Sequence, residues 1–292
     1  MDMSNTELQT TENSLLFVDE LGLEGIRQLQ ANAAAEAGVE TFFQDNLKSS
    51  GQGPALAVIP AGRFDMGSSA DELGHRREEA PRHPTLIKYA FAIGIYPIMA
   101  EEFERFRQAT EWYLRPELIW HKGRYPVINI RMQDVKYYLA WLSDETGQTY
   151  RLPTEAEWEF AARAGSVTPF YHGEDVSCRE VHFNPFFPYK PLQNKQRWFM
   201  PRCFPSPKAS EVGIRIPNAW GLHDMHGNVW EFTSSHWTSS HLNANRDGTP
   251  SLSANPNWYV TKGGSWFDPA TMARRKKKKK RYLDEMDTNL GF

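Results

Sequence analysis

The spacing of apolar positions separates a short N-terminal part of the chain from a long C-terminal part. Residues 1–13 are mostly polar without periodicity and are predicted to be disordered. Residues 14–54 are predicted to form a helical extension and a linker, because apolar residues recur at helical spacing and glycine, serine and proline gather at the end. The apolar positions with this spacing are Leu23, Ile26 and Leu29.

Residues 55–292 are predicted to form one domain that mixes short strands, helices and long loops. The apolar spacing predicts amphipathic helices at 99–110 and 132–147. A third, short helix is expected after a capping box formed by Thr154 and Glu157, whose three-residue spacing lets each side chain bind the other's backbone N–H. These local signals are the strongest in the first half of the domain.

The second half of the domain has little regular pattern. Short strands are expected at 229–233 and 258–266, where apolar and polar residues alternate beside glycine turns. Residues 166–218 are rich in proline, phenylalanine and asparagine and show neither helical nor strand spacing. This region is therefore predicted to form long, irregular, packed loops. Loops of this length inside a compact domain are usually functional.

The composition indicates a globular protein with one concentrated basic segment. Hydrophobic residues make up 40% and aromatic residues 13% of the 292 residues, which suffices for a large core. Eight consecutive basic residues occupy 274–281, and without them 25 basic residues stand against 36 acidic ones, a balance of −11. This asymmetry favours a local electrostatic role over a surface that broadly binds nucleic acid.

Cysteine use and the N-terminal sequence bear on the cellular compartment. Cys178 and Cys203 form no C-x-x-C pair and lack zinc-site spacing, so we expect two free thiols, with a single disulfide as the alternative. The N-terminus lacks the basic and apolar regions of a signal peptide, and the most apolar stretch, 89–100, is too short to span a bilayer. We therefore expect a soluble, cytoplasmic protein that does not enter a membrane.

Five segments of the chain together form a specific pattern. They are VIPAGRFDMGS (58–68), YRLPTEAEWEFAARAG (150–165), GLHDMHGNVWEFTSS (221–235), KGGSW (262–266) and NLGF (289–292). In this order they resemble the formylglycine-generating enzyme, or sulfatase-modifying factor, family. The resemblance implies an α+β, elaborated C-type-lectin-like fold with low regular secondary structure, a small antiparallel sheet, two flanking helices and long packed loops. Since the family includes both enzymes and binding proteins, the fold alone does not give the function.

The residues at the family's copper-binding positions argue against formylglycine-generating oxidase activity. The family holds copper with two cysteines after the G-G-S-aromatic motif, and the matching residues here are Asp268 and Ala273, which supply no soft sulfur ligand. The family's iron enzymes draw histidines from an extra N-terminal domain, whereas the N-terminal extension here contains none. Histidines that could still meet in space are His182, His226 and His236. An iron-dependent or cofactor-free oxidoreductase, related to sulfoxide synthases or siderophore-maturation enzymes, remains the alternative function.

A calcium site is the metal site that the resemblance favours. The segment DMHGNVWE (224–231) matches a family loop that wraps a structural Ca²⁺, an ion that prefers oxygen ligands. The matching ligands are the side chains of Asp224 and Glu231 and the backbone carbonyls of Gly227 and Val229. The alternative is that Asp224 caps a turn and Glu231 pairs with a nearby cation.

The basic run lies between the GGSW and NLGF motifs, in the segment 266–290 that lines the family's ligand-binding face. In a strand, alternate side chains would face solvent or the site, and lysine stems could pack while their ammonium groups reach water. Three interpretations remain open: a solvated basic face, a site for an anion or acidic partner, and a nucleic-acid site. The last is disfavoured because no aromatic residues interleave with the lysines.

The leading hypothesis is a ligand- or protein-binding module whose face is built by the C-terminal segment, as in the retroelement-diversified variable proteins of this fold. Aromatic anchors with a charged rim would supply the binding energy. The predicted binding residues are Trp266, Asp268, Lys276, Lys278, Lys280, Tyr282 and Asp284, with Trp230 and Trp237 around them. The expected partner is a protein or an anionic ligand.

Overall fold

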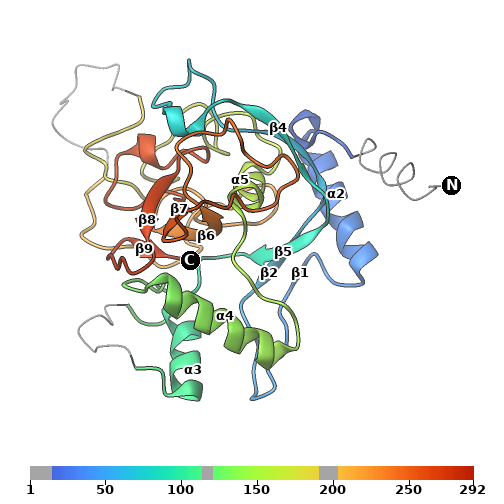
Figure 1. The fold of residues 1–292 in the computed structure, drawn as a ribbon, viewed down its shortest axis with the longest axis vertical. Coiled ribbons are helices and arrows are strands. Elements are labelled where there is room, and N and C mark those ends of the chain that lie inside the picture. The colour runs from blue at the N-terminus through green and yellow to red at the C-terminus, as the bar shows by residue number, and fades with distance from the viewer. Residues whose placement is uncertain (1–14, 114–120, 191–202) are drawn as a thin grey trace.

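The computed structural model describes residues 15–113, 121–190 and 203–292, so the expected disorder of residues 1–13 lies outside the described residues (Figure 1). The helices are α2 (Leu23–Ala37), α3 (Ala100–Thr110), α4 (Met132–Thr146) and α5 (Glu155–Arg163), with 3₁₀ turns η1 (Val18–Glu20), η2 (Arg77–Glu79) and η4 (Ala270–Met272). The strands are β1 (Phe42–Phe43), β2 (Leu56–Ile59), β3 (Gly62–Met66), β4 (His83–Ile87), β5 (Phe91–Gly94), β6 (Trp230–His236), β7 (Trp258–Lys262), β8 (Lys279–Tyr282) and β9 (Leu290–Gly291). None of the described helices is long and apolar enough to cross a bilayer.

The strands form three small sheets. Their orders are β1-β2-β5, β3-β4 and β8-β7-β6-β9, and every pairing is antiparallel except that of β6 with β9. In the four-stranded sheet Trp230 lies opposite Leu290, and Val260 lies opposite Lys280. The GNVWE and NLGF motifs therefore meet in one sheet, and GGSW follows directly after its strand β7, although the three are far apart in the sequence.

Helix α5 is the centre of the molecule, with β4 on one side and β6 and β7 on the other (Figure 1). The predicted capping box is confirmed: Thr154 Oγ1 accepts from the N–H of Glu157 at 3.1 Å, and Thr154 N–H donates to Glu157 Oε2 at 2.8 Å. All nine residues of α5 are buried, including Trp158, which is fully enclosed. A helix covered on all faces holds its own charged residues inside the protein, so they need internal partners.

The N-terminal extension packs against this core. Ile26 of α2 is buried, and Gln30 donates from Nε2 to the carbonyl oxygens of Val58 (2.9 Å) and Trp220 (3.1 Å). Within 166–190 and 203–218 the structure contains no helix or strand, in agreement with the irregular loops expected there. The α+β fold with short strands and long packed loops is confirmed.

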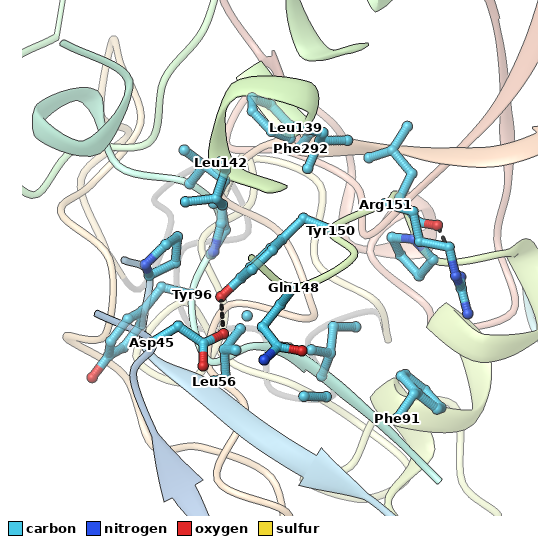
Figure 2. Close-up of a pocket in the computed structure, with 18 of the residues that line it drawn as sticks. Asp45, Leu56, Phe91, Tyr96, Leu139, Leu142, Gln148, Tyr150, Arg151 and Phe292 are labelled. Atoms are coloured by element: carbon cyan, nitrogen blue, oxygen red, sulfur yellow. Dashed lines mark hydrogen bonds between the residues drawn. The ribbon is translucent and has the colours of Figure 1, made fainter. Parts of the chain in front are cut away.

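A second core forms where α3 and α4 meet the end of the four-stranded sheet. The aromatic rings of Phe103, Phe106, Tyr138 and Phe292 pack against one another there, with centroids 5.2–6.5 Å apart. Between α4, the β1-β2-β5 sheet and residues 148–153 lies a cavity of about 560 Å³ (Figure 2).

Candidate functional site

The basic run is mostly buried, contrary to the alternation expected for it. The side chains of residues 274–278 are enclosed, because this part of the run is an irregular turn and β8 begins only at Lys279. Within β8 the alternation holds: Lys280 and Tyr282 are exposed, and Arg281 between them is buried. Lys276 and Lys278, predicted to face a ligand, therefore lie inside the protein.

Of the five enclosed basic residues, Arg275 donates to Ser166 Oγ, and the other four pair with buried or half-buried carboxylates. The segment 72–79 supplies three of them: Glu72 bonds to Arg274 and to Lys276, in both cases at 2.6 Å, Glu79 accepts twice from Arg274 at 3.0 Å, and Glu78 pairs with Lys277. Burial alone would raise the pKa of Glu72, but Lys276 and Arg274 outweigh burial and lower it. The run thus fastens the acidic segment to the domain, which is a structural role.

The remaining enclosed lysine, Lys278, pairs with Glu155 of α5 at 3.3 Å. Burial lowers the pKa of Lys278, although Glu155 raises it in part. Its ammonium group also lies 5.3 Å from the ring centre of Trp237, where the ring's negative face attracts a cation. Trp237 therefore lies beside the buried ion pair of Lys278 and Glu155, near the protein surface.

Acidification is expected to destabilise the protein through Glu155. Burial would raise its pKa, but Lys278 and His241 outweigh burial and hold the pKa at about 2, below the ordinary 4.5. Because the folded-state pKa is the lower one, the contribution to stability is complete above pH 4.5 and is lost as the pH falls toward about 2. Melting temperatures recorded across this range should fall, and Glu155→Gln should show a shallower decline. An unchanged slope in the variant would contradict the assignment.

Asp268, which the family resemblance matched to a copper ligand, lies at the centre of a hydrogen-bonded cluster. Its Oδ2 accepts from Trp230 Nε1 at 2.7 Å and from Ser265 Oγ, and Ser265 Oγ in turn accepts from Asn289 Nδ2 at 2.9 Å. Trp266 follows Ser265 and directs its indole N–H to the carbonyl oxygen of Thr288 at 3.5 Å. Three of the predicted binding residues, Trp230, Trp266 and Asp268, therefore lie together in this cluster. The cluster offers carboxylate and hydroxyl oxygens but no sulfur.

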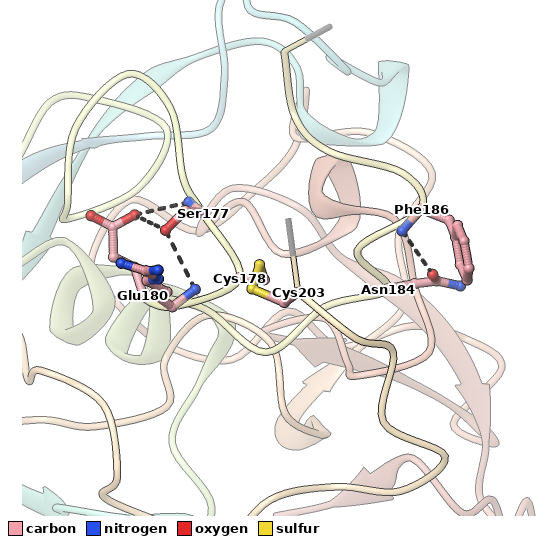
Figure 3. Close-up of a disulfide and its surroundings, with 7 residues drawn as sticks. Ser177, Cys178, Glu180, Asn184, Phe186 and Cys203 are labelled. Carbon is pink, nitrogen blue, oxygen red and sulfur yellow. Dashed lines mark hydrogen bonds between the residues drawn. A yellow bond between two sulfur atoms is a disulfide. The ribbon is translucent and has the colours of Figure 1, made fainter. Parts of the chain in front are cut away.

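Ala273, which the resemblance matched to the second copper ligand, has no side-chain atom that could bind a metal. Ala273 is buried, and its carbonyl oxygen accepts a hydrogen bond from His226 Nδ1 at 2.7 Å. The two cysteines are joined to each other as a disulfide, with their Cα atoms 6.2 Å apart, so the expected free thiols were wrong (Figure 3). They are 25 residues apart in sequence and form none of the short-range pairs that a sequence motif would reveal.

Two other predicted binding residues line a polar hollow of about 630 Å³ at the ends of β6, β7 and β8. Trp237 and Lys280 lie in its wall together with Trp258, which the sequence interpretation missed. Lys280 Nζ lies 4.0 Å from the ring centre of Trp258, and Tyr282 packs edge-on against the same ring. The rest of the wall is almost entirely hydroxyl and amide side chains: Thr238, Ser239, Ser240, Asn243, Asn245, Ser251, Ser253 and Asn255.

The predicted face is therefore divided into separate places. Trp230, Trp266 and Asp268 belong to the Asp268 cluster, Trp237 and Lys280 belong to the hollow with Tyr282 at its edge, and Lys276 and Lys278 are internal. Asp284 is exposed and lines neither the hollow nor the cavity of Figure 2. The alternating serine, threonine and asparagine residues between 238 and 255 were the sequence signal that could have indicated the hollow.

The predicted calcium ligands Asp224 and Glu231 are both buried carboxylates with one unpartnered oxygen. Asp224 Oδ2 accepts from Gly213 N–H and Glu231 Oε2 accepts from Trp158 Nε1, both at 2.8 Å, while Asp224 Oδ1 and Glu231 Oε1 have no hydrogen-bond partner among the described residues. Burial raises the pKa of both, that of Glu231 to about 8 with a further contribution from Asp224. Unpartnered, mutually repelling buried carboxylates are what a cation would stabilise, so the residues fit calcium.

The loop between these carboxylates needs glycine at position 227. Its φ is +75°, and a Cβ there would lie 2.2 Å from the carbonyl oxygen of His182.

The histidines His182, His226 and His236 do not converge: they contact Ser210, Ala273 and Ser253, respectively. No group of three or more histidine, cysteine or acidic side chains is arranged to hold a metal within the described part of the chain.

Comparison with known proteins agrees with the motif pattern. Residues 43–292 match the sulfatase-modifying factor enzyme 1-like domain. The inactive C-alpha-formylglycine-generating enzyme 2 of Mus musculus is 27% identical over 300 residues, covering 82% of this chain and 85% of that protein. The structure of PvdO from Pseudomonas aeruginosa is similar with a TM-score of 0.72 and 30% identity, covering 86% and 96% of the two chains. Treponema denticola variable protein 1 shares the fold at 18% identity, with a TM-score of 0.63 and coverage of 87% and 98%.

Proposed function

The chain belongs to the sulfatase-modifying factor enzyme 1-like family, and from this premise we propose that it is a ligand-binding member without copper oxidase activity. The observation that carries the proposal is the replacement of both copper ligands. Asp268 is held by Trp230 and Ser265, Ala273 is buried, and the cysteines elsewhere in the chain are bonded to each other. A site of hard oxygen atoms does not suit Cu(I).

The polar hollow is the binding site that we favour. Trp237 and Trp258 offer apolar ring faces, while the hydroxyl and amide groups around them offer many hydrogen bonds, a combination that suits a polyhydroxylated ring. Lys280 is the one charged residue among the described residues of the wall. The proposed ligand is therefore a sugar that carries an acidic group, which narrows the earlier expectation of an anionic ligand.

Titration with glucuronate and glucose, followed by tryptophan fluorescence, tests this site. The wild-type protein should bind glucuronate more tightly than glucose, and Lys280→Ala should weaken glucuronate binding roughly 10- to 100-fold, since a hydrogen bond to a charged group contributes roughly 1.5–3 kcal/mol. Trp237→Ala should weaken the binding of both sugars. Lys122→Ala, which removes an exposed lysine outside the hollow, is the control and should leave both affinities unchanged. Equal glucuronate binding by wild type and Lys280→Ala would refute the assignment.

We also propose that Asp224 and Glu231, with the carbonyls of Gly227 and Val229, hold a structural Ca²⁺. The two unpartnered carboxylate oxygens support this proposal. Calcium would link Asp224, in the loop before β6, to Glu231 at the start of β6, and so would hold the four-stranded sheet in place. Its role would be stabilising, because neither carboxylate lines the polar hollow.

A second candidate function, a copper-free enzyme, is favoured by one observation. Asp268 places a carboxylate in hydrogen-bond contact with Ser265 Oγ where the family keeps its thiolates, so a proton acceptor stands at the family's reactive position. The iron-dependent form of this alternative has less support, because the histidines are dispersed. The cytoplasmic location stays a prediction, and the disulfide favours an oxidising compartment instead.

A further inference from the structure

The cavity beside α4 has the size and lining of a small-molecule site. It measures about 560 Å³, within the range of ligand pockets, and it is bounded by β1, β2, β5, α4 and residues 148–153. Figure 2 shows apolar side chains from several of these elements around it, among them Leu56, Phe91, Leu139 and Leu142. An apolar ligand in this space would take the apolar walls out of water and gain packing contacts with them.

Polar groups gather at one side of this cavity. Tyr150 donates from its hydroxyl to Asp45 Oδ2 at 2.7 Å, and Gln148 lies beside the pair (Figure 2). Burial and Asp45 raise the pKa of Tyr150, so its hydroxyl keeps the proton and remains a donor. Asp45 has a second oxygen for which no hydrogen bond is seen among the described residues, and this oxygen can accept one from a ligand.

The charges around the cavity favour a cation. Arg151, the basic residue of the lining, already donates from both terminal nitrogens to Glu157 at 2.7 Å. His223 is also engaged, through Nδ1 and the carbonyl of Arg215. Because Glu157 neutralises Arg151, the carboxylate of Asp45 gives the described part of the lining its negative charge. A positively charged group entering the cavity would meet Asp45 without displacing an existing cation.

From these observations we infer that the cavity binds a small amphiphilic amine. The apolar body occupies the space between Leu56, Leu139 and Leu142, and the ammonium group donates hydrogen bonds to Asp45 beside the hydroxyl of Tyr150. A carboxylate at the same place would be repelled by Asp45, and a neutral alcohol would gain burial but no charge-assisted bond. The inference is independent of the polar hollow, because the two linings share no residue.

Isothermal titration of the whole chain with octylamine, octanol and octanoate tests this site. Octylamine should bind saturably with one molecule per chain, and octanoate should bind at least about tenfold more weakly, as expected for the loss of a charge-assisted hydrogen bond. Asp45→Asn preserves the size of the side chain and should remove the preference for the amine, while octanol binding stays unchanged. Asp144→Asn, an exposed aspartate on α4, is the matched control and should behave as wild type.

A second variant tests the cavity itself. Leu139→Trp places a larger side chain in the space and should abolish binding of both octylamine and octanol, whereas Leu139→Met should retain both. Melting temperatures of the variants verify that they are folded. Absence of saturable octylamine binding to the wild-type protein, equal affinity for octanoate, or unchanged selectivity in Asp45→Asn would each overturn the inference.

Discussion

Replacement of Glu79 by glutamine is expected to lower the free energy of unfolding by about 3–5 kcal/mol, because it removes one charge of a buried ion-pair group and leaves its partners uncompensated. Glu79 is fully enclosed; it accepts two hydrogen bonds from Arg274 at 3.0 Å and one from Ser68 Oγ at 2.8 Å, and it lies 3.7 Å from Lys277. Glutamine has nearly the same shape, so the change removes charge rather than volume. Urea denaturation followed by tryptophan fluorescence measures the loss.

The control for this variant is Glu40→Gln. Glu40 is exposed, and a charge in water contributes little to stability, so the change should be within about 0.5 kcal/mol of wild type. If Glu79→Gln were also that mild, the basic run would not depend on segment 72–79, and the structural role assigned to the run would be wrong.

Calcium is expected to raise the free energy of unfolding by about 2.7 kcal/mol when its concentration is a hundredfold above its Kd. The reason is that the ion binds only the folded arrangement of Asp224 and Glu231. Thermal unfolding in excess calcium and in excess EDTA measures the difference. Asp224→Asn should lose this difference and, in EDTA, should be at least as stable as wild type, since it removes one of two mutually repelling buried carboxylates.

Metal analysis of the purified protein separates this proposal from the enzymatic alternative. Calcium at one ion per chain, removed by the Asp224→Asn substitution, supports the structural site. Asp144→Asn is again the matched control and should retain the ion. Iron at one ion per chain would instead favour the oxidoreductase. It would show that histidines bind a metal although the described residues contain no close group of them.

The sequence alone determined those features that depend on near neighbours in the chain or on an ordered set of motifs. The capping box at Thr154 is a local interaction of residues three positions apart, and its spacing is therefore visible in one dimension. The amphipathic periodicity placed α3 and α4, and the five motifs in their order predicted the family and the fold. Asp268 and Ala273 argued against copper from the sequence alone, because aspartate and alanine lack sulfur whatever their surroundings.

The tertiary structure alone decided which side chains meet. Glu72 and Lys276 are 204 residues apart, so no local pattern could show that the acidic segment pairs with Arg274, Lys276 and Lys277. The same holds for the disulfide between Cys178 and Cys203, for the joining of Trp237, Trp258 and Lys280 in one hollow, and for the bond between Asp45 and Tyr150. Burial of a charge depends on all the elements packed around it, and those elements come from distant parts of the chain. For this reason Lys276 and Lys278, which were predicted to face a ligand, are held inside the folded protein.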